Sequence, residues 1–294
     1  MAGLMTHATS PRARLRALLA QNAPVTAPGA YDALSARLVE EAGFDVVYMT
    51  GFGTTASLIG RPDVGLLSGS EMVDNARRIV SAVDVPVVAD ADTGYGNAVN
   101  VLRTVQLYEQ AGVAGVQLED QVMPKKCGHM SGKLIISAKE MVGKIHAAVD
   151  ARRDSDLVII ARTDAVAVDG LTAAIDRAKA FADAGADLLF VEAPASEEDI
   201  ATVAAELRGV APLVFNWAEG GKTPPLPAER IAELGFSLIL YPIGTLLAAT
   251  AGIRTLLASL RRDGVPALDG LPAFGEFTDF MGLPEVQALE QRYT

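Results

Sequence analysis

The chain is poor in several kinds of residue, and each shortage excludes a class of protein. Its 294 residues include one cysteine, so an internal disulfide is impossible, as is usual in a reducing cytoplasm. Lysine and arginine total 25 against 36 acidic residues, and the formal net charge of −11 argues against a general nucleic-acid binder. No run of about 18 uncharged apolar residues occurs, and the N-terminal sequence lacks the apolar core of a signal peptide. We therefore expect a cytoplasmic protein that binds neither nucleic acid nor a membrane.

Half of the residues are hydrophobic, and short apolar runs alternate with longer amphipathic segments. The runs are continuously apolar, which is typical of parallel strands buried on both faces. Strands are expected at 24–27, 45–49, 86–89, 115–118, 157–161, 188–191, 212–215 and 237–240. Helices are expected at 32–42, 70–83, 99–111, 137–152, 171–184, 197–207, 227–234 and 245–262. This alternation favours an α/β fold of the (β/α)₈ TIM-barrel type over an open doubly wound sheet.

The C-terminal part of the chain differs in character from the rest. No linker rich in Ser, Gly or Pro divides residues 1–263, which we interpret as one barrel domain. Residues 264–294 begin with a stretch rich in Gly and Pro, and a short helical pattern, Pro284–Tyr293, follows. After a completed barrel, such an extension either caps the barrel or packs on a partner subunit.

Polar residues occur where nearly every expected strand ends. They are Tyr48, Thr50, Asp90, Asp92, Glu119, Asp120, Arg162, Asp164, Glu192 and Asn216. The C-terminal ends of barrel strands form the active site, so these side chains are expected to converge. Asp90 and Asp92 are two positions apart and would face the same side of an extended segment. Carboxylates at close range raise each other's pKa, and a divalent cation such as Mg²⁺ or Mn²⁺ is the usual remedy.

A loop of about fifteen residues, long for a compact barrel and therefore typical of a functional lid, follows the fourth strand. It contains Lys125, Lys126, Cys127, Gly128 and His129. Two lysines and a histidine beside the cysteine are expected to favour its thiolate form and to make it reactive.

Two further segments are less informative. Asn216 is the second residue of the segment FNWAEGGKTPP (215–225), and it either orients a carboxylate or carbonyl of a substrate or belongs to a turn-rich connector. GFGTTA (51–56) superficially matches a dinucleotide-binding fingerprint. We reject that match because the acidic residue about 20 positions further on, Glu71, begins a helix and does not end a strand.

Together these motifs resemble those of the isocitrate lyase/phosphoenolpyruvate mutase superfamily. The resemblance covers GAYDALSA (29–36), YMTGFGTTASLIGRPDVG (48–65), DADTGYGNA (90–98), LEDQVMPKKCGH (118–129), ARTDA (161–165), VEAP (191–194), NWAEGGKTP (216–224) and YP (241–242). It implies a (β/α)₈ barrel assembled as a homotetramer, a dimer of dimers whose C-terminal helices are exchanged between subunits.

The resemblance also implies a role for individual positions. Asp90 and Asp92 would hold Mg²⁺, with Asp63 and Glu119 in support. Thr50, Gly51, Phe52, Gly128, Arg162, Glu192 and Asn216 would bind the substrate. Cys127 would be the general acid, with Lys125 and His129 beside it, and Tyr48 would stabilise a developing oxyanion.

The activity implied is that of an oxo-acid lyase, which cleaves a small 2-hydroxydicarboxylate such as 2,3-dimethylmalate or a methylisocitrate-like acid. The products would be a 2-oxoacid and a carboxylic acid. Leu247 and Met130 stand where methylisocitrate lyases tend to carry arginine, which argues against a third substrate carboxylate. An oxaloacetate hydrolase and a carboxyvinyl-carboxyphosphonate phosphorylmutase, which forms a P–C bond, remain alternatives. A non-catalytic scaffold is disfavoured, because it has no need of this set of polar residues.

Overall fold

A computed structural model of the chain describes residues 10–21 and 23–294. Eight parallel strands form a nearly closed barrel in the order β6-β5-β4-β3-β2-β1-β8-β7. They are β1 (Val25–Ala30), β2 (Val47–Met49), β3 (Val87–Asp90), β4 (Gly115–Glu119), β5 (Val158–Thr163), β6 (Leu188–Val191), β7 (Val214–Asn216) and β8 (Leu238–Tyr241). A parallel bridge between Leu189 and Leu213 joins the two ends of this order. The predicted barrel is thereby confirmed.

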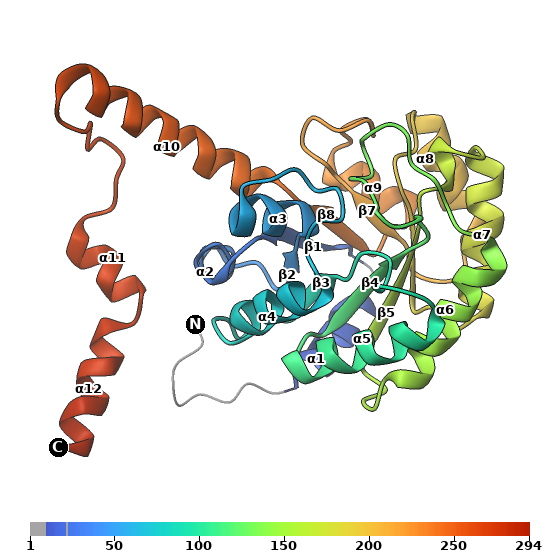
Figure 1. Cartoon of the computed structure of the whole chain (residues 1–294), viewed down its shortest axis with the longest axis horizontal. Coiled ribbons are helices and arrows are strands. Elements are labelled where there is room, and N and C mark those ends of the chain that lie inside the picture. Colours follow the sequence, from blue (N-terminus) through green and yellow to red (C-terminus); the bar gives the residue numbers. More distant parts are fainter. Residues whose placement is uncertain (1–9, 22) are drawn as a thin grey trace.

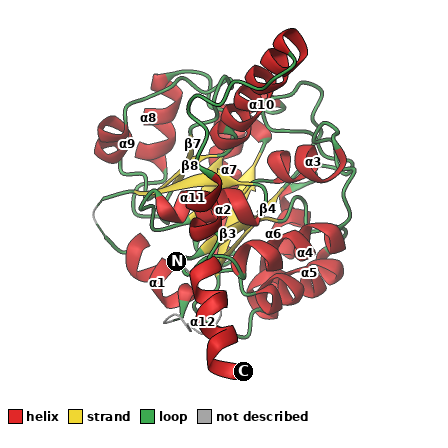
Figure 2. Cartoon of the chain, turned by 90° about the vertical axis from the view of Figure 1, so that its left-hand side faces the viewer, coloured by secondary structure: helices red, strands yellow, loops and turns green. Residues whose placement is uncertain are grey.

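The helices described are α1 (Pro11–Leu19), α2 (Ala33–Glu41), α3 (Gly51–Ile59), α4 (Gly69–Val80), α5 (Ala98–Ala111), α6 (Ala138–Ala151), α7 (Leu171–Asp183), α8 (Glu197–Glu206), α9 (Ala228–Leu234), α10 (Gly244–Asp263), α11 (Phe274–Phe280) and α12 (Leu283–Tyr293), with a 3₁₀ turn at Ala165–Ala167. Helices α2–α9 surround the strands as an outer ring, whereas α10–α12 extend from the barrel (Figure 2). The sequence prediction missed α1, α3 and α11. None of the helices described is long and apolar enough to cross a bilayer.

Helix α3 was missed because its glycines and threonines resemble a loop. The Thr50 side chain nevertheless accepts a hydrogen bond from the Gly53 N–H at 3.3 Å and so caps the first turn. Gly60 ends the helix in a left-handed conformation. This helix begins directly after β2, so its N-terminus points into the mouth of the barrel.

Alternate residues of the strands form two separate apolar layers. The layer inside the barrel consists of Leu15, Val25, Ala27, Val46, Tyr48, Val88, Ala114, Val158, Ile160, Leu188, Phe190, Val214, Leu238 and Leu240. Leu15 belongs to α1, so this helix closes the N-terminal end of the barrel. Residues such as Met49 and Leu118 belong to the larger layer that packs between strands and helices.

The inward-facing rows of the strands continue into the functional residues. Side chains two positions apart on a strand face the same side. The residues two positions after an interior apolar residue are Thr50, Asp90, Arg162, Glu192 and Asn216. The same alternation that fills the barrel interior therefore directs these polar side chains into its C-terminal mouth.

Residues 244–294, here called the C-terminal arm, leave the barrel. Helix α10 projects away from the barrel. The chain then turns back, and α11 and α12 lie beside the barrel (Figure 1). Large apolar residues exposed on the arm are Leu247, Ile253, Leu257, Leu260, Val265, Leu268, Leu271, Phe274, Phe277, Met281, Leu283, Val286 and Tyr293. The arm touches its own barrel where Arg37 Nη2 in α2 donates to the Phe280 carbonyl at 2.6 Å.

Candidate active site

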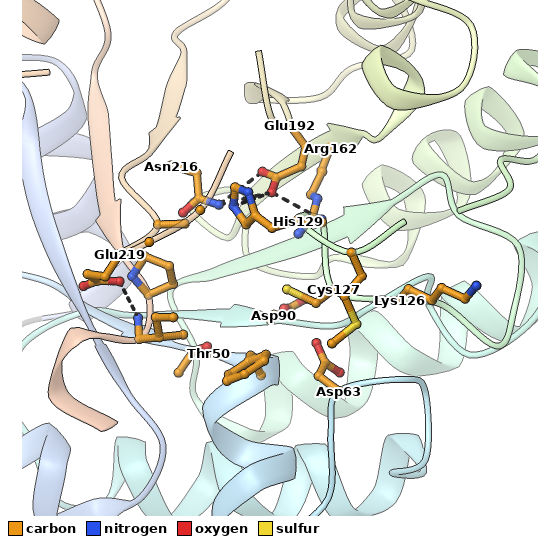
Figure 3. Close-up of a pocket in the computed structure, with 18 of the residues that line it drawn as sticks. Thr50, Asp63, Asp90, Lys126, Cys127, His129, Arg162, Glu192, Asn216 and Glu219 are labelled. Carbon is orange, nitrogen blue, oxygen red and sulfur yellow. Dashed lines mark hydrogen bonds and ion pairs between the residues drawn. The ribbon is translucent and has the colours of Figure 1, made fainter. Parts of the chain in front are cut away.

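A cavity of about 230 Å³ opens at the C-terminal ends of the strands (Figure 3). The predicted site residues that line it are Tyr48, Thr50, Phe52, Asp63, Asp90, Lys125, Cys127, Gly128, His129, Arg162, Glu192 and Asn216. The remaining three, Gly51, Asp92 and Glu119, are buried directly against this lining. The structure thus brings together residues that span more than half of the sequence.

Four carboxylates, here called the acidic cluster, surround Lys125 of the loop after β4; they belong to Asp63, Asp90, Asp92 and Glu119. The Lys125 Nζ is 2.7 Å from Asp63 Oδ2 and 2.7 Å from Asp92 Oδ1, and all three side chains are buried. Burial lowers the pKa of the Lys125 ammonium, but Asp92 and Asp63 raise that pKa by more, so it lies well above its ordinary value. The ammonium is therefore charged, and it connects this loop to two other loops at the barrel mouth.

Burial disfavours the ionised form of two further carboxylates of the cluster, Asp90 and Glu119. Asp90 Oδ1 accepts hydrogen bonds from the Asp92 N–H at 3.0 Å and from Gln117 Nε2 at 3.4 Å. Burial and the neighbouring Asp92 raise the pKa of Asp90 to about 6. Burial raises the pKa of Glu119 well above its ordinary value, and its Oε1 is a buried acceptor without a hydrogen-bond partner among the described residues.

Asp92 belongs to the cluster, but its backbone conformation differs from the predicted one. An extended segment was expected to place Asp90 and Asp92 on one side, but β3 ends at Asp90 and Asp92 has a φ of 48°. That left-handed conformation is unusual for residues other than glycine, although aspartate tolerates it better than most. The turn, held by a hydrogen bond from the Tyr95 hydroxyl to Asp92 Oδ2 at 3.1 Å, directs the Asp92 carboxylate towards Lys125.

Arg162 is the second buried cation of the site. Its Nε and Nη2 donate to the two oxygens of Asp164 at 3.0 and 3.1 Å, and Nη1 lies 3.3 Å from Glu119 Oε2. The guanidinium also lies over the ring of Phe190, 5.2 Å from its centre. Burial raises the pKa of Asp164, but Arg162 and Lys133 lower it by more. These contacts fix the guanidinium before any ligand arrives.

Lys133 is a buried site residue that the sequence analysis missed. Its Nζ donates to Asp164 Oδ1 at 2.7 Å and to the Gly128 carbonyl. It therefore links the loop after β4 to the carboxylate that orients Arg162. The residues around it, SGKLII (131–136), resemble an ordinary exposed connector and give no sign of this burial.

The side chains of His129 and Asn216 both contact the Glu192 carboxylate. Asn216 Nδ2 donates to the two Glu192 oxygens at 3.3 and 3.2 Å, and His129 Nε2 lies 3.2 Å from Glu192 Oε1. The Lys222 N–H donates to His129 Nδ1 at 3.0 Å, so the proton of the neutral imidazole must be on Nε2, which faces Glu192. Burial lowers the pKa of His129, which favours this neutral form.

The loop after β4 lies across Arg162 and Glu192. Its two sides pair at Gln121 and Ile135, and the Cys127 N–H donates to the Asp63 carbonyl at 3.2 Å. A Cβ at Gly128 would collide with Glu192 and Arg162, so only glycine permits this close approach.

The prediction that the surroundings of Cys127 favour its thiolate form is wrong. Burial raises the pKa of the thiol above its ordinary value. The neighbouring lysines do not offset this effect, because Lys125 pairs with Asp63 and Asp92 and Lys126 Nζ donates to the Gly132 carbonyl at 2.8 Å. Cys127 therefore holds its proton at neutral pH and is suited to donate it.

The acidic cluster has the chemistry of a site for a hydrated hard cation. In residues 10–21 and 23–294, no three His, Cys, Asp or Glu side chains are placed to hold a metal ion together. Mg²⁺ usually keeps several waters and takes only one or two carboxylates, so it does not need such a set. Glu119 Oε1 is a buried acceptor without a partner among the described residues, and burial and Asp92 raise the pKa of Asp90, so a bound cation would stabilise the ionised forms of both carboxylates.

Comparison with known proteins identifies relatives over nearly the whole chain. The family model described as phosphoenolpyruvate phosphomutase matches residues 15–261. A 2,3-dimethylmalate lyase of Eubacterium barkeri is 48% identical over 96% of this chain and 97% of its own. A probable 2-methylisocitrate lyase of Corynebacterium glutamicum is 44% identical over 90% of this chain and 86% of its own.

Solved structures show the same fold at similar identity. An oxaloacetate acetylhydrolase in complex with the inhibitor 3,3-difluorooxalacetate superposes with a TM-score of 0.92 at 40% identity, covering 97% of each chain. A phosphonopyruvate hydrolase in complex with oxalate and Mg²⁺ superposes with a TM-score of 0.88 at 34% identity, covering 97% of this chain and 99% of its own.

The raised pKa of Cys127 predicts slow alkylation at neutral pH. Because only the thiolate reacts with iodoacetamide, the rate should rise with pH and reach half its limit above about 8.5, the value of a free cysteine. Mass spectrometry of the intact protein between about pH 7 and pH 10 measures this rate, with free cysteine as the reference. A half-maximal rate below the reference value would contradict a protonated Cys127, and Cys127→Ser supplies the blank.

Proposed function

Because the chain belongs to the phosphoenolpyruvate phosphomutase family, we propose that it is a lyase that cleaves a C–C bond of a small 2-hydroxydicarboxylate. The observation that carries this proposal is that Cys127 shares one cavity with Arg162, Asp63 and Asp90, and burial raises the pKa of its thiol. Lyases among the relatives support the same reaction class. Met130 lines the cavity where an arginine would favour a tricarboxylate, so a diacid is the better fit.

Mg²⁺ is the cofactor that we propose for the acidic cluster, with Mn²⁺ as the alternative. Asp90 and Asp92 would hold the ion, with Asp63 and Glu119 in support. When bound, such an ion stabilises negative charge that develops on substrate oxygens. The phosphonopyruvate hydrolase solved with Mg²⁺ shares this fold and supports the assignment.

Backbone and side-chain donors would position the substrate. In the segment Thr50–Phe52, the Thr50 N–H donates to the Ala30 carbonyl at 3.1 Å, whereas the N–H groups of Gly51 and Phe52 begin α3, have no partner within the helix and suit a carboxylate. Arg162 would bind and polarise a second anionic group, and its contacts with Asp164 and Glu192 keep it in place. Burial and Asp90 raise the pKa of Tyr48, so its hydroxyl stays protonated and can stabilise an oxyanion.

Cleavage would proceed by transfer of two protons. A general base takes the proton of the 2-hydroxyl, the C2–O bond becomes a carbonyl, and the electron pair of the C2–C3 bond moves to C3. The resulting enolate takes the Cys127 proton at C3, which gives a 2-oxoacid and a carboxylic acid. The loop that carries Cys127 lies across Arg162 and Glu192, where it would exclude water from the enolate.

Hydrolysis of oxaloacetate is the second candidate. The superposition on oxaloacetate acetylhydrolase over 97% of each chain favours it. The two reactions break a C–C bond next to an oxygen-bearing carbon of a small diacid, so the same cavity suits both. Their products differ, because hydrolysis of oxaloacetate gives oxalate and acetate.

A panel of substrates with Mg²⁺ tests the proposed function. We expect turnover of 2,3-dimethylmalate with release of a 2-oxoacid, and loss of turnover when the metal is chelated. Cys127→Ser should lower kcat by about 100-fold or more, the range of general acid catalysis, because the enolate loses its proton donor. Steady-state kinetics with detection of the 2-oxoacid measures both effects.

The panel also includes citramalate, methylisocitrate, isocitrate, oxaloacetate and phosphonopyruvate. Turnover of phosphonopyruvate alone would contradict the lyase assignment and favour phosphorus–carbon chemistry. Release of oxalate from oxaloacetate alone would favour the second candidate. An unchanged kcat in Cys127→Ser would contradict the role of the thiol.

We further propose that residues 264–294, the outer part of the C-terminal arm, pack on a neighbouring subunit and that the chain is a homotetramer of two helix-exchanged dimers. The apolar side chains exposed along the arm support this assembly, because monomeric proteins rarely expose so many in one region. Phe274, which is 85% exposed, is the clearest example.

The assembly is tested by replacing Phe274 with aspartate. We expect the wild type to have the mass of four 30.7 kDa chains and Phe274→Asp to shift to a smaller species, because a charge would be buried at the interface. Light scattering after size-exclusion chromatography measures the masses, with Gln291→Ala on exposed α12 as the control. A monomeric wild type, or a tetrameric Phe274→Asp, would contradict the proposed exchange.

A further inference from the structure

Tyr95 contacts the acidic cluster from outside the lining of the cavity. It lies in the loop between β3 and α5, and its ring packs against the larger apolar layer of the barrel. Its hydroxyl donates to Asp92 Oδ2 at 3.1 Å, whereas Lys125 Nζ lies 2.7 Å from the other oxygen of that carboxylate, Oδ1. The Tyr95 hydroxyl therefore occupies one oxygen of Asp92 and leaves the other directed into the cluster.

Asp90 has a similar arrangement. Its Oδ1 accepts hydrogen bonds from the Asp92 N–H at 3.0 Å and from Gln117 Nε2 at 3.4 Å. Its Oδ2 faces Gly51, where an added Cβ would lie 2.7 Å from this oxygen and 3.5 Å from Asp92 Oδ1. Each of the two carboxylates thus has one oxygen held by a donor of the protein and one oxygen beside Gly51.

The backbone of the loop that carries Asp92 is fixed by other groups than Tyr95. Each of the five consecutive carbonyl groups from Asp90 to Gly94 accepts a hydrogen bond of 2.9 or 3.0 Å. The donors are, in chain order of the acceptors, the Tyr108 hydroxyl, the Gly94 N–H, the Glu119 N–H, Lys144 Nζ and the Thr104 hydroxyl. Loss of the Tyr95 hydroxyl would therefore free the Asp92 carboxylate to rotate while the loop keeps its other bonds.

The number of oxygens that a carboxylate offers affects which cation it prefers. Ca²⁺ accepts about six to eight oxygens in flexible geometry and binds carboxylates through one oxygen or both. Mg²⁺ requires near-octahedral geometry and usually keeps several waters beside one or two carboxylates. A carboxylate that offers a single oxygen therefore suits Mg²⁺ better than Ca²⁺.

We infer that Tyr95 is a positioning residue that favours Mg²⁺ over Ca²⁺ at the acidic cluster, because its hydroxyl prevents Asp92 from binding a cation through both oxygens. Hydrogen-bond partners of ligating residues commonly change metal affinity by about tenfold or more. Glu119 Oε1, a buried acceptor without a partner among the described residues, independently indicates that the cluster accommodates a cation. The inference rests on the proposed cation site but not on the proposed reaction.

Competition with Mn²⁺ tests the inference without turnover. Free Mn²⁺ gives an electron paramagnetic resonance signal that is lost on binding and returns when Mg²⁺ or Ca²⁺ displaces it, so both affinities are measured on one protein sample. In Tyr95→Phe, which keeps the ring and removes the hydroxyl, Mg²⁺ should bind about tenfold more weakly, whereas Ca²⁺ should bind equally or more tightly. Tyr95→Leu, which also lacks the hydroxyl, should show the same shift in the ratio of the two affinities.

Gln117→Met is the matched control, because it removes another side-chain donor from the cluster. Asp90 Oδ1 keeps its bond to the Asp92 N–H in this variant, and the bond that is lost is long, so the affinity ratio should change by less than about threefold. An unchanged ratio in Tyr95→Phe would overturn the inference. This includes an equal loss for both ions, which is the result expected if Tyr95 has a merely structural role.

The wild type separates this inference from the proposed cofactor. If it binds none of the three cations, the proposed cation site fails and the inference fails with it. If it binds Mg²⁺ and the affinity ratio is the same in Tyr95→Phe, the cation site stands and only the role of Tyr95 is overturned.

Discussion

The ion pairs of Lys125 with Asp63 and Asp92 are the interaction on which the site depends. The three side chains come from three different loops, so one buried ammonium fixes those loops relative to one another. Cys127 lies two residues further along the same loop, and its N–H also bonds to the Asp63 carbonyl. Breaking a buried pair leaves an uncompensated charge, which makes this arrangement costly to disturb.

Arg162 makes the corresponding connection on the other side of the cavity. Asp164 holds its guanidinium, and Lys133 holds both Asp164 and the Gly128 carbonyl of the loop after β4. The loop is therefore attached to the barrel by a buried cation at each of two points. The position of the protonated Cys127 thiol between them follows from these attachments, and so does the proposed delivery of its proton to an enolate.

Much of the fold and part of the site could be predicted from the sequence, because both depend on local pattern. Continuous apolar runs identified the strands, and polar residues at their ends identified the mouth of the barrel. The protonation state of Cys127 could not be predicted, because burial and the pairing of Lys125 elsewhere decide it. Lys133 was missed for the same reason: its partners are a carbonyl and a carboxylate group that only the fold brings near it.

When its carboxylates are ionised, the acidic cluster carries more negative charge than Lys125 and Arg162 neutralise, and we propose that a divalent cation takes up the surplus. Urea unfolding of Lys125→Met with and without Mg²⁺ provides the sharpest test. Without Mg²⁺ the variant should lose about 3–5 kcal/mol of unfolding free energy, and Mg²⁺ should stabilise it more than it stabilises the wild type. Lys126→Met is the control, because Lys126 Nζ bonds only to carbonyl groups among its described contacts. Equal stabilisation of variant and wild type by Mg²⁺, or none in either, would contradict the account.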